Sequence, residues 1–442
     1  MRIQDTSTPV VVLRSDSHGG LNIIRSLGRL GVPVYNVDPN PLAPAYFSRY
    51  CHGKFLWDIE HRPAQESAEY LLQVREKIGK PCILIPTTDR TARLVTAQAH
   101  VLRKGFIFPK QSAELTDTLS SKMGMYQLAR RHNIPTPEAV FPKSREDVLS
   151  FLDRARFPIM LKGIDGQRLW DKTGKKMFIV RSKDELLARY DAAEDLENPN
   201  LMLQEYIPGG DDSVWMFNGY FNESSECLVA FTGRKIRQSP VYTGSTSLGI
   251  CLHSETVKNL TVEFMRALGY TGILDIGYRY DARDGEYKVL DANPRIGATF
   301  RLFVGQNGMD VARALYLDLT KQEVVSYPAK EGRKWVVEDL DLVSCYRYHR
   351  DGKLTFKQWI SSFRGVEEAA FLSSDDPLPV FLMCLARTKE LFHRIFRAAN
   401  GRVALSTEKR PVYFPKPLLR SDKRSGFFTR FQIFGAIRRM LP

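Results

Sequence analysis

The chain has 442 residues, enough for two or three domains, and its 43% hydrophobic, 26% charged and 11% aromatic residues are typical of a globular protein. Its apolar runs fall well short of the roughly 18 residues that cross a bilayer, and no basic region followed by an apolar core opens the sequence, so we expect neither a membrane span nor a secretory signal. The six cysteines lie far apart without metal-ligand spacing, which favours reduced thiols in a cytosol.

The formal net charge of +14 is concentrated at the C-terminal end. From Leu385 onward there are 14 Lys and Arg residues against 3 Asp and Glu, a net charge of +11, so the first 384 residues carry only +3. The excess positive charge therefore lies in the C-terminal tail and not in the rest of the chain. For this reason we do not expect specific nucleic-acid binding.

Strands and helices alternate in the first quarter of the chain, which predicts a parallel sheet with helices on both faces. The predicted elements are a strand at 10–15, a turn at 16–20, a helix at 21–31, and strands at 32–38, 81–89 and 105–109 with a helix before the last.

A second pattern follows the segment 134–137, which its two prolines keep extended. It predicts strands at 157–163, 176–180 and 201–207, helices at 182–191 and 254–268, a β-hairpin at 271–293, and folded structure at 330–375.

The hairpin 271–293 is predicted to gather oxygen ligands on one face. Alternate residues of a strand share a face, so Asp291 and Asn293 point the same way. A three-residue loop at 283–285, with its Gly in the left-handed conformation, sets Asp275 opposite Asn293, whereas a two-residue turn would turn Asp275 away. Such ligands suit Mg²⁺, and ordinary solvated acids on an exposed hairpin face are the alternative.

Two basic residues next to apolar strands favour an anion nearby. Arg295 follows the hairpin and can brace a phosphate or a developing negative charge. Lys162 ends an apolar strand, where burying an ammonium group is costly unless it meets an anion.

The order of these features resembles the ATP-grasp superfamily, and more narrowly its carboxylate–amine ligase branch, to which D-aspartate ligases belong. Lys122 lies on a helix before the proline segment, Lys162 follows, Glu205 ends a strand with Asp212 seven residues beyond, and the D…D-x-N hairpin comes last. The resemblance covers residues 8 to 325, and no single motif in it is specific.

The resemblance implies a fold of mixed α/β and α+β class. It places a parallel-sheet pre-ATP-grasp domain at 1–115 and a two-lobed ATP-grasp domain at 116–325. Within the latter, the lid lobe spans 135–205 and the metal-bearing lobe 206–325. A mostly helical C-terminal extension with a basic tail follows at 326–442.

The resemblance also implies binding roles for ATP and two Mg²⁺ ions, with Mn²⁺ as a substitute. Lys122 and Lys162 would hold the α- and β-phosphates, and Asp212 the ribose hydroxyls. The interlobe hinge would pair with adenine through Gln204, Glu205, Tyr206 and Ile207, with Glu205 meeting the amino group. The metal ligands would be Asp275, Asp291 and Asn293, although the family more often has Glu at the position of Asp291.

The implied reaction joins a small-molecule carboxylate to an amine through an acyl phosphate, releasing ADP and phosphate. Arg295 and the segment 231–247, with Arg234, Lys235 and Arg237, would bind the carboxylate or the transferring phosphoryl group; an exposed basic strand is the alternative. The loop 163–176 would be a flap over the triphosphate, or else a plain hairpin with a basic tip.

Two other functions stay open. The turn containing Ser17, His18, Gly19 and Gly20, with Asp38 at the end of the next strand, imitates an NAD-binding fingerprint but lacks the full glycine pattern; substrate contact and a purely structural turn are its other readings. The second alternative is a non-catalytic ATP-binding scaffold.

The C-terminal tail has its own readings. The segment 379–397 is predicted to form an amphipathic helix with a basic face, and 425–442 mixes aromatic residues with arginine. Residues 385–442 are candidates to bind an anionic membrane surface or an acidic partner, which would place a cytoplasmic protein at the inner face of the membrane. A helical appendage packed on the body is the alternative.

Overall fold

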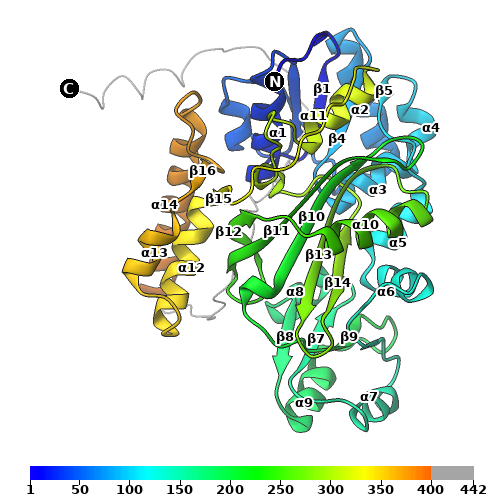
Figure 1. Ribbon diagram of the computed structural model, residues 1–442, viewed down its shortest axis with the longest axis vertical. Coiled ribbons are helices and arrows are strands. Elements are labelled where there is room, and N and C mark those ends of the chain that lie inside the picture. Colours follow the sequence, from blue (N-terminus) through cyan, green and yellow to red (C-terminus); the bar gives the residue numbers. More distant parts are fainter. Residues whose placement is uncertain (400–442) are drawn as a thin grey trace, which may run out of the picture. The chain divides into compact units, whose positions relative to one another are not determined.

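The computed structural model describes residues 1–399, and its first domain is built on a parallel sheet (Figure 1). The five strands lie in the order β3-β2-β1-β4-β5, each parallel to its neighbour, so the predicted parallel sheet is confirmed, although β3 was not among the predicted strands. They are β1 (Val10–Leu13), β2 (Val34–Asp38), β3 (Cys51–Leu56), β4 (Cys82–Pro86) and β5 (Phe106–Ile107).

Both faces of this sheet are covered, which explains why β1 is apolar throughout. Val10 and Val12 pack in one core with helix α1 (His18–Gly28), while Val11 and Leu13 pack in another with α2 (Ala64–Ile78). Helices α3 (Asp89–Ala97) and α4 (Ala99–Leu102) follow β4, and α5 (Ala113–Ser120) and α6 (Lys122–Arg131) lead out of the domain.

The second sheet is small and antiparallel, with the order β6-β9-β7-β8. Its strands are β6 (Ala139–Val140), β7 (Ile159–Gly163), β8 (Met177–Val180) and β9 (Leu201–Glu205), with helices α7 (Arg145–Leu152) and α9 (Lys183–Ala193). Ser182 caps α9, since its hydroxyl accepts from the Glu185 backbone N–H.

The segment 163–176 differs from the predicted loop. It contains a helix, α8 (Gly166–Thr173), because Leu169 is buried in the core of the small sheet with Leu161 and Val180. A packed helix takes the place of an open flap or a plain hairpin.

The third sheet has seven strands in the order β14-β13-β10-β11-β12-β15-β16. The central five are β10 (Val214–Phe221), β11 (Cys227–Ser239), β12 (Ser245–Cys251), β13 (Gly272–Asp281) and β14 (Glu286–Asn293), accompanied by helix α10 (Glu255–Ala267). Met216 and Tyr220 pack toward α1 and α11 (Val311–Leu319), whereas Phe217 and Phe221 pack toward α10 on the opposite face.

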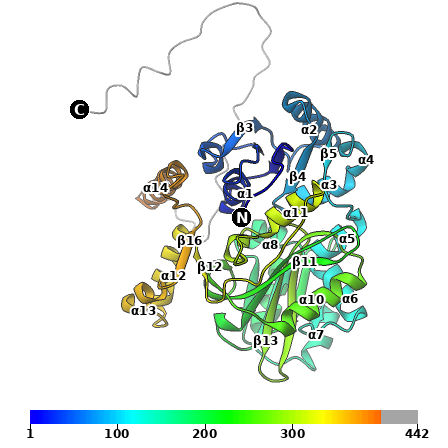
Figure 2. The ribbon, with the colours of Figure 1, turned by 45° about the horizontal axis from the view of Figure 1, so that its top comes forward.

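Residues after 330 complete this sheet, so the C-terminal region is more than the mostly helical extension predicted. β15 (Lys334–Val336) pairs with β12, and β16 (Val366–Ala369) pairs with β15. Helices α12 (Glu338–Arg350), α13 (Phe356–Ser362) and α14 (Leu378–Ala399) lie together beside it (Figure 2).

The predicted helix at 379–397 is confirmed as α14. Across residues 1–399 no helix has the length and hydrophobicity required to traverse a bilayer. The segment 425–442 lies outside the described residues.

Candidate active site

The hairpin β13–β14 brings Asp275 directly opposite Asn293, as predicted. The route to that pairing differs, because the loop between the paired residues Asp281 and Glu286 has four residues rather than three. An extra residue in β14, Leu290, shifts the register between Gly277 and Tyr278 and restores the predicted pairing. Gly285 has φ 77°, the left-handed conformation expected.

The Asp275 carboxylate is enclosed by neighbouring groups. The Asn293 Nδ2 lies 3.5 Å from its Oδ2. A Cβ on Gly297 would come within 2.4 Å of the same oxygen, so only glycine fits there. Burial raises the pKa of Asp275 to about 6. The positive charge of Arg295 opposes this rise, and the negative charge of the nearby Asp291 adds to it.

Asp291 is exposed on the same face and is the electrostatic centre of the site. Its charge acts on Lys122 at the start of α6, on Lys162 in β7 and on Lys235 in β11, and it opposes the burial that lowers the pKa of each lysine. The pKa of Lys162 is lowered to about 8, because a second cation, Lys122, adds to the desolvation. Three elements distant in sequence therefore bring cations to one carboxylate.

The three lysines donate to neutral oxygens. The Lys122 Nζ lies 3.2 Å from the Ile164 carbonyl oxygen, and the Lys235 Nζ lies 2.9 Å from that of Gly244. The Lys162 Nζ donates to the Gln204 side chain. Within residues 1–399 none of the three forms an ion pair within 4.0 Å, so each has capacity for an anion.

The donor set fits a magnesium ion that completes its coordination with substrate oxygens. The described residues contain no cluster of three or more His, Cys, Asp or Glu suited to a metal. The hairpin face supplies two carboxylates and one carboxamide, with Asp275 opposite Asn293 and Asp291 opposite Gly277. Mg²⁺ is commonly held by one or two carboxylates together with phosphates.

Arg295 connects the hairpin to the first domain. Its Nε donates to Asp89 Oδ1 at 2.7 Å, and its Nη2 donates to Asn293 Oδ1 at 3.1 Å. Asp89 is the first residue of α3, so this arginine joins the N-terminal end of that helix to a predicted metal ligand.

Two of the predicted basic residues in β11 do not face this site. Arg234 lies opposite Trp215, whose side chain packs with the core around Phe217 on the other side of the sheet. Strand alternation therefore turns Arg234 away from Asp275 and leaves only Lys235 on its face. Arg237, after a register shift, is buried in an ion pair of 2.8 Å with Asp341 of α12.

The predicted hinge residues lie at the end of β9 in varied environments. Gln204 is buried and accepts from Lys162, and the backbone oxygen of Ile207 accepts from Arg279 Nε at 2.9 Å. Glu205 forms an ion pair of 2.5 Å with Arg283 of the hairpin loop. Tyr206 is half-buried and Asp212 exposed.

Three residues that the sequence reasoning did not select lie near the predicted ones. Arg279 shares the face of Asp275, four residues away in the same strand, which alternation alone could have indicated. Asp211 rather than Asp212 is held in place, accepting from Gln238 Nε2 at 2.7 Å and from the hydroxyl of Tyr348. No local sequence pattern around Asp89 indicated that it belongs to the site.

The NAD-like turn is held together by its own residues. Asp38 is buried and accepts from the backbone N–H of Ser15 at 2.7 Å and of Asn40 at 2.9 Å. His18 packs against Trp335 with 5.5 Å between ring centroids and the rings tilted by 49°, and Ala298 fills the space beside Gly19. The acidic residue expected to bind a ribose thus serves the turn itself.

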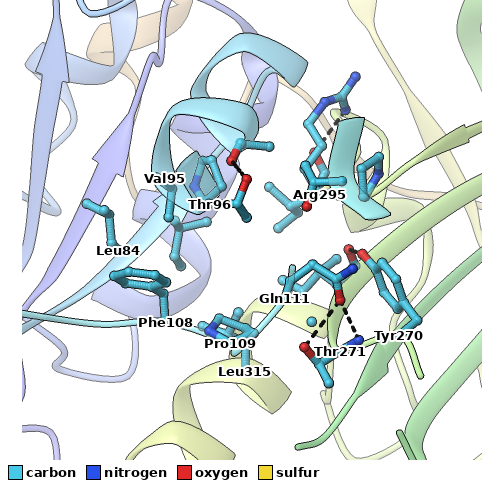
Figure 3. A pocket seen from close by; sticks show the side chains of 18 residues that line it. Leu84, Val95, Thr96, Phe108, Pro109, Gln111, Tyr270, Thr271, Arg295 and Leu315 are labelled. Atoms are coloured by element: carbon cyan, nitrogen blue, oxygen red, sulfur yellow. Dashed lines mark hydrogen bonds between the residues drawn. The ribbon is translucent and has the colours of Figure 1, made fainter. Parts of the chain in front are cut away.

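A cavity of about 60 Å³ lies between the first domain and the hairpin sheet (Figure 3). Leu84 and Val95 line one side and Tyr270 the other, with Arg295 at its edge; the Gln111 side chain accepts from the Thr271 N–H at 2.8 Å. The cavity is mostly apolar and none of the site lysines lines it, so it is distinct from the charged site.

No protein-family model matches the chain. It is 26% identical over 247 residues to D-aspartate ligase of Enterococcus faecium, covering 53% of this chain and 58% of that protein. It is 23% identical over 194 residues to the C-terminal section of the carbamoyl phosphate synthase large chain of Methanocaldococcus jannaschii, covering 42% and 30%. The chain thus spans less than two thirds of either curated relative.

Solved structures share the fold. N5-carboxyaminoimidazole synthetase from Staphylococcus aureus, complexed with ADP, has a TM-score of 0.56 at 11% identity, with 76% of this chain and 82% of that chain covered. The biotin carboxylase domain of Hydrogenobacter thermophilus 2-oxoglutarate carboxylase, complexed with MgADP, ADP and bicarbonate, has a TM-score of 0.55 at 15% identity, covering 73% and 72%. The chain has the ATP-grasp fold, as the sequence indicated.

Proposed function

We propose that this ATP-grasp protein is an ATP-dependent carboxylate–amine ligase that forms an amide or peptide bond. The observation that carries the proposal is the position of Asp291, whose charge acts on Lys122, Lys162 and Lys235 while it lies on one face with Asp275 and Asn293. Lysines without counterions beside paired carboxylates suit a triphosphate and its metal.

The binding roles in this proposal are those that the ATP-grasp resemblance implies. Lys122 and Lys162 would hold the α- and β-phosphates of ATP, and the end of β9, from Gln204 to Ile207, would receive adenine. Asp212 is exposed near Arg279 and stays a proposal for the ribose hydroxyls.

Asp275, Asp291 and Asn293 would hold Mg²⁺, which when bound neutralises phosphate charge and orients the terminal phosphoryl group. The proposal includes two such ions, with Mn²⁺ as a substitute for Mg²⁺.

The reaction would proceed in two displacements. A substrate carboxylate oxygen attacks the γ-phosphorus, the bond to the β–γ bridging oxygen breaks, and ADP leaves. An amine nitrogen then attacks the acyl carbon, phosphate leaves, and the amine loses a proton. Lys235 and Arg295 would stabilise the negative charge that develops in these steps. Arg234 would not contribute, because it faces the other side of the sheet.

Similarity to D-aspartate ligase supports an amino acid as one substrate class. The test is release of ADP and phosphate from ATP and Mg²⁺ with amino acids of both configurations, supplied singly and in pairs. Release that requires both a carboxylate and an amine is expected. ATP binding without turnover on any pair would instead favour the non-catalytic scaffold, and absence of ATP binding would overturn the proposal.

Matched variants tie the activity to the site. Asp291→Asn and Lys162→Ala should abolish release. Glu286→Gln, which changes an exposed acid at the far end of the same β14, is the control expected to retain it.

A further inference from the structure

Asn218 in β10 carries a carboxamide that no protein group satisfies. The side chain is fully buried, and within the described part of the chain neither its Nδ2 nor its Oδ1 has a hydrogen-bond partner. Leaving a buried polar group unpaired costs free energy, so such a group needs an explanation.

The position of Asn218 in the sheet supplies an explanation for its unpaired carboxamide. Asn218 lies directly opposite Asp275, and Asp275 lies directly opposite Asn293, so the three side chains form a row on one face of three adjacent strands. Residues directly opposite in an antiparallel pair have Cβ atoms about 4.5–5.5 Å apart, within reach of a hydrogen bond between an amide and a carboxylate.

The other neighbours of Asn218 on this face are apolar. Phe231 lies opposite on β11, and Met216 and Tyr220 flank it along β10, all three within one hydrophobic core. Asp275 is therefore the polar group beside it. That carboxylate is in turn short of donors, since the Asn293 amide reaches it only at 3.5 Å.

We propose that Asn218 is a positioning residue for the metal site: its amide, which has no partner within the described residues of the free protein, becomes a donor to the facing Asp275 carboxylate when the site is occupied and fixes the direction in which that carboxylate presents its free oxygen. Complete burial keeps Asn218 from touching nucleotide or solvent, so it acts through Asp275. Gly297 also lies against this carboxylate, because a Cβ there would collide with it. The inference rests on the proposed function.

The test measures the Mg²⁺ concentration that half-saturates ATP binding, by calorimetry on the full chain, together with thermal unfolding. Asn218→Leu keeps the size and removes the amide. It should raise the half-saturating Mg²⁺ concentration by about 10- to 100-fold, the usual effect of losing a partner of a metal ligand. Its unfolding temperature should be equal or higher, because an unpaired polar group has gone.

Phe217→Leu, on the same strand but the opposite face, is the matched control. It should lower the unfolding temperature and leave the Mg²⁺ requirement unchanged. If the leucine prevents folding, Asn218→Ala replaces it, because alanine is too small to clash. The same rise in the half-saturating Mg²⁺ concentration is expected.

An unchanged Mg²⁺ requirement in a folded Asn218 variant would overturn the positioning role. Absence of Mg²⁺-dependent ATP binding in the unaltered protein would instead overturn the proposed function, so the two failures are distinguishable.

Discussion

Two groups of cations in this protein, one buried and one half-buried, differ in what lies opposite them. At the junction with the C-terminal helices, Arg237 meets Asp341 at 2.8 Å and Arg25 meets Asp376 at 2.9 Å, with both partners of each pair almost completely buried. The site lysines 122, 162 and 235 donate only to neutral oxygens. A buried cation with its own carboxylate belongs to the fold, whereas one without a counterion is prepared for a ligand's charge.

Arg237→Ala should give the largest effect on stability. It leaves Asp341 buried without its cation, and we expect a loss of about 3–5 kcal/mol in the free energy of unfolding, measured by denaturant titration. Replacing both partners by leucine should recover much of that loss. An Arg237→Ala protein as stable as the original would contradict the distinction between the two groups.

Lys162→Met should show the opposite pattern. Removing a half-buried cation without a counterion should leave stability unchanged or higher, while ATP affinity in Mg²⁺ falls by about 100-fold, which is about 2.8 kcal/mol. Equilibrium binding and thermal unfolding on the same sample measure both. A large loss of stability with unchanged ATP affinity would place this lysine with the structural arginines.

Proton uptake should accompany ATP binding above pH 8. Burial lowers the pKa of Lys162 from its ordinary 10.5 to about 8, so the free site loses this charge as pH rises through that value. A bound phosphate favours the ammonium form, and affinity should therefore decline above pH 8. Between about pH 8 and 10.5 the unfolded chain binds this proton more tightly than the folded protein does. In this range Lys162 therefore makes the free energy of unfolding rise with pH. Calorimetry in buffers of different ionisation enthalpy measures the uptake; equal heats would argue against it.

Glu205→Gln should lower the free energy of unfolding far less than Arg237→Ala does. Glu205 pairs with Arg283, whose side chain is 44% exposed, and pairs in such positions contribute about 1 kcal/mol or less. Denaturant titration checks this. A loss as large as that in Arg237→Ala would mean that this pair, too, holds the fold together.

Much of the hairpin site could be predicted from the sequence, because a strand period of two fixes which residues share a face. The predicted length of the hairpin loop, three residues, was wrong. The bulge at Leu290 adds one residue to β14 without disturbing the apolar pattern, so the sequence did not reveal it. The orientation of Arg234 depended on the strand register, which the basic run itself did not reveal. Asn218 looked like an ordinary polar strand residue, and only its alignment with Asp275 gave it a role.

The sequence by itself determined the order of strands and helices, the parallel first sheet, the apolar faces and the set of charged groups at strand ends, since these depend on local periodicity and composition. The tertiary structure alone decided which charges meet. Asp89 and Arg295 are 206 residues apart, and Arg237 and Asp341 are 104 apart. Local pattern does not encode such contacts, because they arise when separate hydrophobic faces pack against each other and carry their polar edges together.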